Sequence, residues 1–418
     1  MSPRAGVLVA LPACALLATA PAPAEESRVE DRDSFVLRTS LKGSLLLSRT
    51  PDDPRLFAER DEATSFWRLR LEPEARLGRS LTAVVAYEHR LRVFSTSAAR
   101  TGLRVLPPES PAPYRIRQLE WAVSSSTGSS WRHEIDRASV GLHLPGVELT
   151  LGRQAVGWGR GVLFGAVDFF APFAPLEADR EWRRGVDAVR ADVKVSGRAS
   201  VEVVGAFGES IDASAFAGRL RGYAGRADLE LVAGRRSRDL FAGLTSSAAV
   251  GEAEIHAELA LFRAPEPLPA TPERRSALKA VVGGSYRLPL GNGVLLYAEY
   301  HYSGFGAPHA REILALLADP GFLRRYLRGD TQILGRHALG VLASLEVSPE
   351  LALAGQWLQS PVDGSGLVAP SATVTLGDTV SLLAAVYLPY GRAPSGGTLR
   401  TEYGAASRSA FVQVRIHE

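Results

Sequence analysis

Arginine and acidic side chains gather between Leu149 and Val193, among glycines, prolines and aromatic residues. A guanidinium group presents a planar fork of N–H donors that suits carboxylates and phosphates. We expect neighbouring acids to neutralise some of these arginines and to leave the others for solute. The segment therefore predicts salt-bridged packing around a solute site, and its candidate residues are Arg153, Arg160, Arg183, Arg184, Arg190 and Asp187.

A second set of arginines alternates with apolar residues near the start of the chain. Arg68, Arg70 and Arg90 share one face of their segments with Glu72 and Glu88. Opposed rows of charge inside a water-filled pore create a transverse field, which selects solutes by charge. The alternative is a network of salt bridges that only holds the wall in shape.

The sequence gives little support to catalysis. Its eight histidines are scattered without metal-ligand spacing, and no Gly-x-Ser-x-Gly or His-Glu-x-x-His motif occurs. We therefore predict a protein that is not an enzyme, with no catalytic residue, no metal and no cofactor. A hydrolase whose Ser, His and acid come from neighbouring strands stays as a weaker alternative, because such sites form in space rather than in sequence.

The elements that must position these residues are strands. From Trp67 to Leu77, apolar and charged residues mostly alternate, and only an extended strand sorts them onto two faces. The same alternation returns across the chain, which is typical of a transmembrane barrel. We predict an all-β fold, a transmembrane antiparallel up-and-down β-barrel of about eighteen strands with a water-filled lumen.

Tight turns and long loops alternate along the chain, and this asymmetry predicts an orientation. The expected strands are 35–48, 65–77, 81–94, 134–144, 147–154, 184–195, 199–208, 217–224, 227–234, 240–248, 252–262, 276–288, 294–303, 337–347, 351–360, 367–376, 379–388 and 407–417. Outer-membrane barrels place their long loops outside the cell, so an even count leaves both termini in the periplasm. Merging strands between Gly208 and Gly251 would give about sixteen strands.

Two long loops and a row of aromatic residues have more specific predictions. A loop from Gly157 to Arg184 could tuck into the barrel mouth, anchored by Phe169, Phe170 and Phe173. The segment 311–328 reads as a helix pair, either a lid over the mouth or a loop capped by its own apolar face. Aromatic residues near strand ends would meet lipid headgroups, namely Trp67, Tyr87, Tyr302, Trp357 and Tyr387.

The N-terminus and the overall charge narrow the class of protein. Residues 1–24 read as a secretory signal that ends in Ala22-Pro23-Ala24, so the barrel would comprise residues 25–418. A lipoprotein cleavage before Cys14, the only cysteine, is the alternative. The 48 basic residues, of which only Lys42, Lys194 and Lys279 are lysines, nearly balance 45 acidic ones, so nucleic-acid binding has no support.

The strand that ends in Leu151-Gly152-Arg153-Gln154, followed by Trp158-Gly159-Arg160-Gly161, resembles outer-membrane porin-like barrels of the alginate-export type. The resemblance covers residues 149–193, 45 of the 418. It implies passage of solute or anionic polysaccharide through an arginine-lined pore. The chain departs from outer-membrane barrels at its end, because Ile416-His417-Glu418 replace the usual terminal aromatic residue that the assembly machinery reads.

We therefore expect an outer-membrane porin-like channel of a Gram-negative bacterium that passes small hydrophilic, preferably anionic, solutes or polysaccharide. The alternative is a surface polysaccharide-binding barrel whose lumen is plugged by its loops. The expected partners are outer-membrane lipid and lipopolysaccharide, the barrel assembly machinery and the solute itself, with a monomer or a homotrimer as the assembly.

Overall fold

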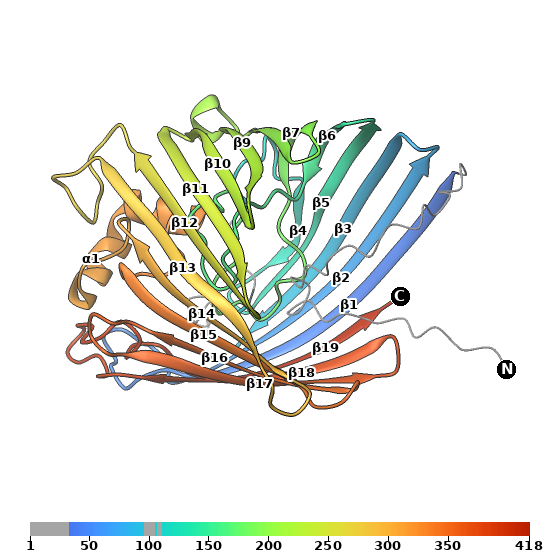
Figure 1. The fold of residues 1–418 in the computed structure, drawn as a ribbon. Helices are drawn as coiled ribbons and strands as arrows, with labels where there is room; N and C mark the ends of the chain where they lie inside the picture. The colour runs from blue at the N-terminus through green and yellow to red at the C-terminus, as the bar shows by residue number, and fades with distance from the viewer. Residues whose placement is uncertain (1–32, 96–104, 107–110) are drawn as a thin grey trace.

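Eighteen antiparallel strands form a closed up-and-down barrel (Figure 1). The computed structural model describes residues 33–95, 105–106 and 111–418. Each wall strand pairs with its neighbours along the chain, and β1 closes the ring by pairing with β19, with Leu46 opposite Phe411. Closure leaves no strand edge unpaired, which is what a sheet needs inside hydrocarbon.

The first half of the wall ends at β10. It contains β1 (Ser34–Arg49), β2 (Asp61–Leu77), β3 (Leu81–Phe94), β5 (Ser129–Leu144), β6 (Val147–Gln154), β7 (Val186–Ser196), β8 (Ala199–Ala206), β9 (Ala215–Ala224) and β10 (Ala227–Arg236). The second half contains β11 (Asp239–Val250), β12 (Ala253–Arg263), β13 (Ser276–Leu288), β14 (Val294–Ser303), β15 (His337–Glu346), β16 (Leu351–Gln359), β17 (Gly366–Leu376), β18 (Val380–Tyr390) and β19 (Arg408–His417). The predicted eighteen-strand barrel is confirmed, because residues 208–251 form separate strands rather than merged ones.

A nineteenth strand, β4 (Glu120–Ser125), is absent from the prediction. It pairs with the first residues of β5, from Ser130 to Glu134, where Trp121 lies opposite His133. The wall strand β6 ends at Gln154. Beyond that point the segment before β4 takes the position of β6 beside β7, because the Asp187 N–H donates to the Tyr114 carbonyl at 2.9 Å. The chain that follows β6 is thereby free to leave the wall.

The two ends of the barrel differ as the turn lengths predict. One end of the barrel holds the short turns at 78–80, 145–146, 251–252 and 377–379. The beginning of β1 and the end of β19 lie at the same end. There the Thr39 N–H donates to the Glu418 carbonyl at 3.0 Å. The long loops lie at the opposite end, where α1 appears in Figure 1.

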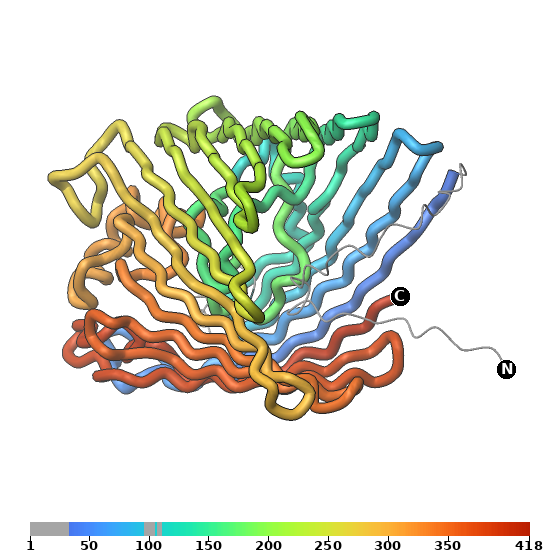
Figure 2. Tube along the Cα trace, viewed as in Figure 1, coloured from blue at the N-terminus to red at the C-terminus, as the bar shows by residue number. Residues whose placement is uncertain are grey.

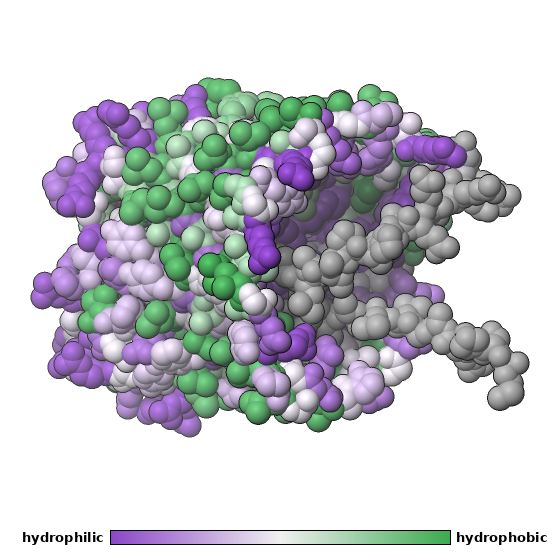
Figure 3. Space-filling model, viewed as in Figure 1, coloured by the Kyte–Doolittle hydropathy of each residue, from purple (hydrophilic) through white to green (hydrophobic). Residues whose placement is uncertain are grey.

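Apolar side chains cover the outside of the wall, and polar ones face inward. On β12, Ile255, Leu259 and Leu261 are exposed, whereas His256 and Glu258 are buried. Figure 3 shows the apolar residues over the wall and hydrophilic ones in the hollow beside the chain ends. This inside-out arrangement is the one that a membrane barrel requires.

Aromatic residues near the strand ends do not all face outward. Trp67 is half exposed on the outer face. Outside the wall, the Trp357 Nε1 donates to the Tyr390 hydroxyl at 2.8 Å. Tyr387, which the sequence places in the same outer row, instead points inward and is 4% exposed. Its prediction was wrong because proximity to a strand end does not fix which face a residue occupies.

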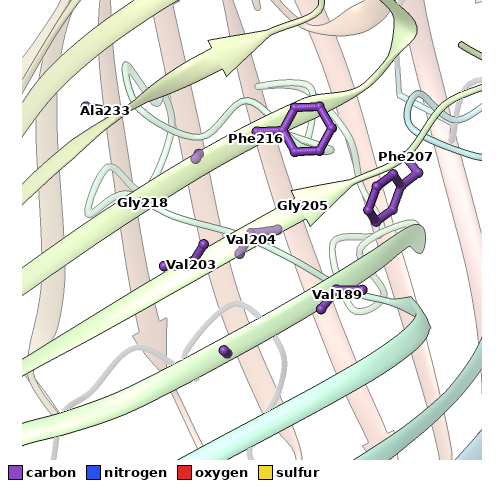
Figure 4. Close-up of a pocket in the computed structure, with 10 residues that line it drawn as sticks. Val189, Val203, Val204, Gly205, Phe207, Phe216, Gly218 and Ala233 are labelled. Atoms are coloured by element: carbon purple, nitrogen blue, oxygen red, sulfur yellow. The ribbon is translucent and has the colours of Figure 1, made fainter. Parts of the chain in front are cut away.

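The outer wall at β7–β10 carries a shallow apolar groove of about 340 Å³. Its floor contains Gly205 and Gly218, and the rings of Phe207 and Phe216 lie 5.7 Å apart at one end (Figure 4). No charged residue lines it. The groove is therefore part of the lipid-facing surface.

The predicted helix pair between β14 and β15 is present as α1 (Ile313–Ala318) and α2 (Pro320–Arg328). The Asp319 side chain caps α2 by accepting from the Phe322 N–H at 2.8 Å. Ile313 and Phe322 form a small buried cluster with Leu399 from the loop between β18 and β19. No helix among the described residues has the length and apolar character needed to span a bilayer.

Candidate functional site

The loop between β6 and β7, residues 155–185, leaves the wall and runs through the lumen (Figure 2). It contacts widely separated strands. The Trp158 Nε1 donates to Glu202 of β8 at 3.0 Å, and Gln356 of β16 donates to the Pro175 carbonyl at 2.8 Å. This segment, called the lumen loop below, divides the interior of the barrel.

Two wall carboxylates hold the first half of the lumen loop through its backbone. Glu258 of β12 accepts from four N–H groups, those of residues 160, 161, 166 and 167. Glu299 of β14 accepts from three, those of residues 162, 163 and 164, at 2.6–3.0 Å. Gly161 allows this wrap, because a Cβ there would collide with the Phe164 carbonyl. Hydrogen bonds to a buried charge are among the strong ones, so these acids act as a latch.

Aromatic packing supports the same half of the loop. The Phe169 and Phe170 rings lie 4.9 Å apart and are fully buried, and Trp158 meets both edge-on. Phe169 also contacts Phe241 of β11, with ring centroids 4.3 Å apart. Phe173 instead lies under the Arg183 guanidinium, 5.1 Å from its ring centroid.

The second half of the loop is held by charge. Asp179 accepts from Lys42 of β1 at 3.0 Å and pairs with Arg68 of β2, and Glu181 also pairs with Lys42. Burial acts to raise the pKa of Asp179, but Arg68 and Lys42 outweigh it and hold that pKa below its usual range. The Lys42 ammonium also lies 3.8 Å from the Trp182 ring centroid.

Beside this contact, arginines and acids of β2, β3 and β5 form a continuous network. Arg70 bonds Glu88 at 2.6 Å and Asp136 at 3.0 Å. Arg90 and the loop residue Arg115 both pair with Glu134. The predicted opposition of arginines and acids is thus present inside the barrel.

A pocket of about 60 Å³, called the narrow passage below, remains between this network and the lumen loop. It has room for only a few water molecules. Its polar lining consists of Arg68, Arg90, Arg184 and Arg328 with Glu88, Glu134, Asp136 and Glu177, and Trp182 and Phe173 add aromatic surface. Three candidates from the sequence therefore line this site together, namely Arg68, Arg90 and Arg184. Arg70 belongs to the adjoining network but does not line the site.

Arg153 and Asp187 lie elsewhere, at the seam where β6 ends and the segment before β4, which includes Ile116 and Gln118, takes its position in the wall. We call this segment together with β4 the β4 segment. The side chains of Arg153 and Asp187 bond at 2.6 Å, and Arg153 also donates to the carbonyls of Gln118 and Ile135 at 2.8 Å. Asp187 in turn accepts from the Ile116 N–H at 2.9 Å. The pair closes a gap in the wall, so we leave both residues out of the pore lining proposed below.

The three remaining candidates hold the lumen loop or the neighbouring wall. Arg160 pairs with Asp228 and, at 3.2 Å, with Glu230. Arg183 pairs with Asp168 at 2.6 Å within the loop, and Arg190 with Glu202 at 2.9 Å. These ion pairs lie apart from the narrow passage.

Sequence reasoning missed Lys42, Glu134 and Trp182, and it placed Asp179 only among the acids that neutralise neighbouring arginines. Lys42 carried a usable signal, because it is a lysine at an inward position of a strand in a chain that nearly always uses arginine. Asp179 and Trp182 lie in an irregular loop, where no periodicity shows which side chains meet the wall.

The loops at the end opposite the short turns meet around Glu402. Glu402, between β18 and β19, accepts from the Gly335 N–H at 2.7 Å, and its own N–H donates to Asp363 at 2.7 Å. Burial raises the pKa of Glu402 to about 7, although the Gly335 N–H acts in the opposite direction. While the loop is packed, the Glu402 carboxyl group therefore keeps its proton up to about pH 7. In a released loop it loses that proton above about pH 4.5.

We accordingly expect this contact to be strongest below about pH 4.5 and to weaken, by on the order of 3 kcal/mol, as the pH rises through about 7. Hydrogen exchange of residues 391–407, corrected for the intrinsic rate, should accelerate about tenfold between pH 6 and pH 8. Glu402→Gln should remove that dependence. An equal acceleration in the variant would assign it to another group.

Comparison with solved structures supplies counterparts for the fold. The chain is similar to OccAB4 of Acinetobacter baumannii (TM-score 0.53, 10% identity, covering 92% of this chain and 98% of that one). It is also similar to OccAB1 of the same organism (TM-score 0.54, 9% identity, covering 92% of this chain and 96% of that one). A third similar structure is OccK9 (OpdG) of Pseudomonas aeruginosa (TM-score 0.52, 11% identity, covering 92% of this chain and 98% of that one). These proteins are outer-membrane porins, and at such identities the likeness concerns the fold. No protein-family model and no curated protein matches the chain.

The class that the fold defines is therefore the closed, eighteen-strand, up-and-down antiparallel β-barrel. The resemblance to the alginate-export type is a finer statement, and it remains a prediction. The signal peptide at residues 1–24 also remains a prediction, because it lies outside the described residues.

Proposed function

We propose that this protein is an outer-membrane porin that passes small hydrophilic solutes, with a preference for anions, through the passage beside the lumen loop. The likeness to outer-membrane porins supports the location and the passage of small solutes. Both termini would lie in the periplasm, and no catalytic step is assigned.

The observation that carries the anion preference is the unequal use of donors and acceptors along the passage. Glu134 and Asp136 each pair with at least two arginines. In contrast, the Nε groups of Arg68 and Arg90 have no hydrogen-bond partner within the described part of the chain. N–H donors are thus in surplus where the acceptors are already engaged, and because both Nε atoms are buried, the guanidinium groups would act on an anionic solute through their field rather than through bonds from Nε.

Replacing Arg90 by Gln tests this preference. We expect the ratio of anion to cation permeability, from reversal potentials in planar bilayers under a salt gradient, to fall about threefold. Arg76→Gln is the matched control, because Arg76 lies near the short-turn end and its side chain is 61% exposed. Equal effects of the two substitutions, or cation selectivity in the unchanged protein, would contradict the anion preference.

One observation favours the plugged, polysaccharide-binding barrel as a second candidate. The passage is small, and the lumen loop contacts several walls at once. That candidate requires glycan binding without ion flow, so the absence of conductance in the same bilayers would favour it. Lipid, lipopolysaccharide, the barrel assembly machinery and a homotrimer remain predicted partners.

A further inference from the structure

A second group of polar side chains lies on the inner wall, apart from the narrow passage. Lys279 of β13 stands opposite Ser303 of β14, and His301 stands opposite Val281, the next inward residue of β13. Arg236 lies at the end of β10, and Lys279 is within electrostatic range of it. We call these four residues the Lys279 cluster.

All four side chains are buried, and they lack protein partners to an unusual degree. Lys279 is 1% exposed, and the other three are 0% exposed. Among the described residues, both ring nitrogens of His301, the Ser303 hydroxyl and all three guanidinium nitrogens of Arg236 make no hydrogen bond. Nor does any carboxylate of the described chain ion-pair with Lys279. Buried polar groups are normally satisfied, so such a set requires an explanation.

The carboxylates around the cluster are already engaged by other groups. Arg236 has one ion pair, with Asp330 at 3.0 Å, and Asp330 is shared with Arg325 and Arg328. Asp239 serves the same two helix arginines. With Lys279, four cations therefore lie near these two carboxylates, near Glu258, whose oxygens bind the lumen loop, and near Asp168, which pairs with Arg183. A buried charge without a counter-charge is costly.

We propose that the Lys279 cluster binds a small inorganic anion of halide size. Lysine and arginine supply only donors, and serine and histidine can each supply one, so an anion fits where a metal cation does not. The Phe164 ring stacks on His301 at 5.0 Å, and Arg236 lies 4.8 Å from the Phe262 ring centroid, which leaves little room for a larger ion. Because Phe164 belongs to the lumen loop, the bound anion also holds that loop against β14.

Bromide is the probe, since it scatters anomalously. Crystals of the unmodified protein grown or soaked in sodium bromide should show an anomalous peak within hydrogen-bonding distance of the Lys279 Nζ. Crystals of Lys279→Met should not. The absence of a peak in the unmodified protein overturns the proposal outright, whether or not the variant folds.

A measurement in detergent gives a second test. Replacing sodium gluconate by sodium chloride at equal ionic strength should raise the temperature of heat-modifiable gel migration by about 3 °C. Lys279→Met should lose this rise. Lys194→Met should keep it, because Lys194 is exposed at the short-turn end. An equal rise in all three proteins would mean that chloride acts elsewhere, and the site would be rejected.

Discussion

The double variant Glu258→Gln, Glu299→Gln should show a single-channel conductance at least about twofold above that of the unmodified barrel. The two carboxylates accept seven backbone N–H bonds from residues 160–167. A hydrogen bond to a charged group contributes about 1.5–3 kcal/mol, and the amide nitrogen of Gln faces N–H groups that it cannot accept from. Losing even two such bonds shifts the loop toward a released state by a hundredfold or more.

Glu254→Gln is the matched control for the latch. Glu254 lies on the same strand as Glu258, its side chain is 42% exposed, and it contacts His256 rather than the loop. We expect it to leave conductance within about 20% of the original, because it removes no bond to the loop and a substitution of an exposed residue changes stability little. If the double variant conducts no better than Glu254→Gln, the loop is held by its aromatic anchor instead.

Arg153→Met should cause the largest loss of folded barrel among single substitutions. It removes the bond to Asp187 and the donors to the carbonyls of Gln118 and Ile135 in the seam. Breaking a buried pair by removing one partner costs about 3–5 kcal/mol. We expect the yield of heat-modifiable protein in the outer-membrane fraction to fall about tenfold or more.

Arg190→Met tests whether the loss of folded barrel comes from damage to the seam or from removal of any inward arginine. Arg190 stands on the neighbouring strand β7, and its partner Glu202 keeps Arg219 and Trp158 when Arg190 is removed. Its yield should stay near that of the unmodified protein. Comparable losses in the two variants would indicate a general sensitivity to charge removal.

The wall was predictable because a strand exposes its pattern locally. Alternation at Trp67–Leu77 assigns each residue to one of two faces, and tight turns such as 145–146 end the strands. The same reasoning placed Arg68, Arg70 and Arg90 inside the barrel, where they lie. Because each strand has a polar face toward the lumen and an apolar face toward the outside, the alternation alone is sufficient to predict the wall.

The interior was less predictable because it depends on pairings far apart in sequence. Arg153 follows the alternation of β6, yet it meets the β4 segment, whose edge the periodicity does not reveal. Lys42 and Asp179 are 137 residues apart, and nothing local joins them. Glu258 reads as one more inward charge, whereas its role follows from a loop that folds back onto it.

The scarcity of lysine leaves the barrel with one accessible side-chain amine. Lys42 and Lys279 are sealed inside, and Lys194 is exposed beside the short turns. An amine-reactive dye should therefore label the folded barrel at that rim, apart from the chain's own N-terminal amine. With a membrane-impermeant dye, intact cells should leave Lys194 unmodified and opened cells should not, which makes this residue a built-in reporter of which end of the barrel faces the cell exterior.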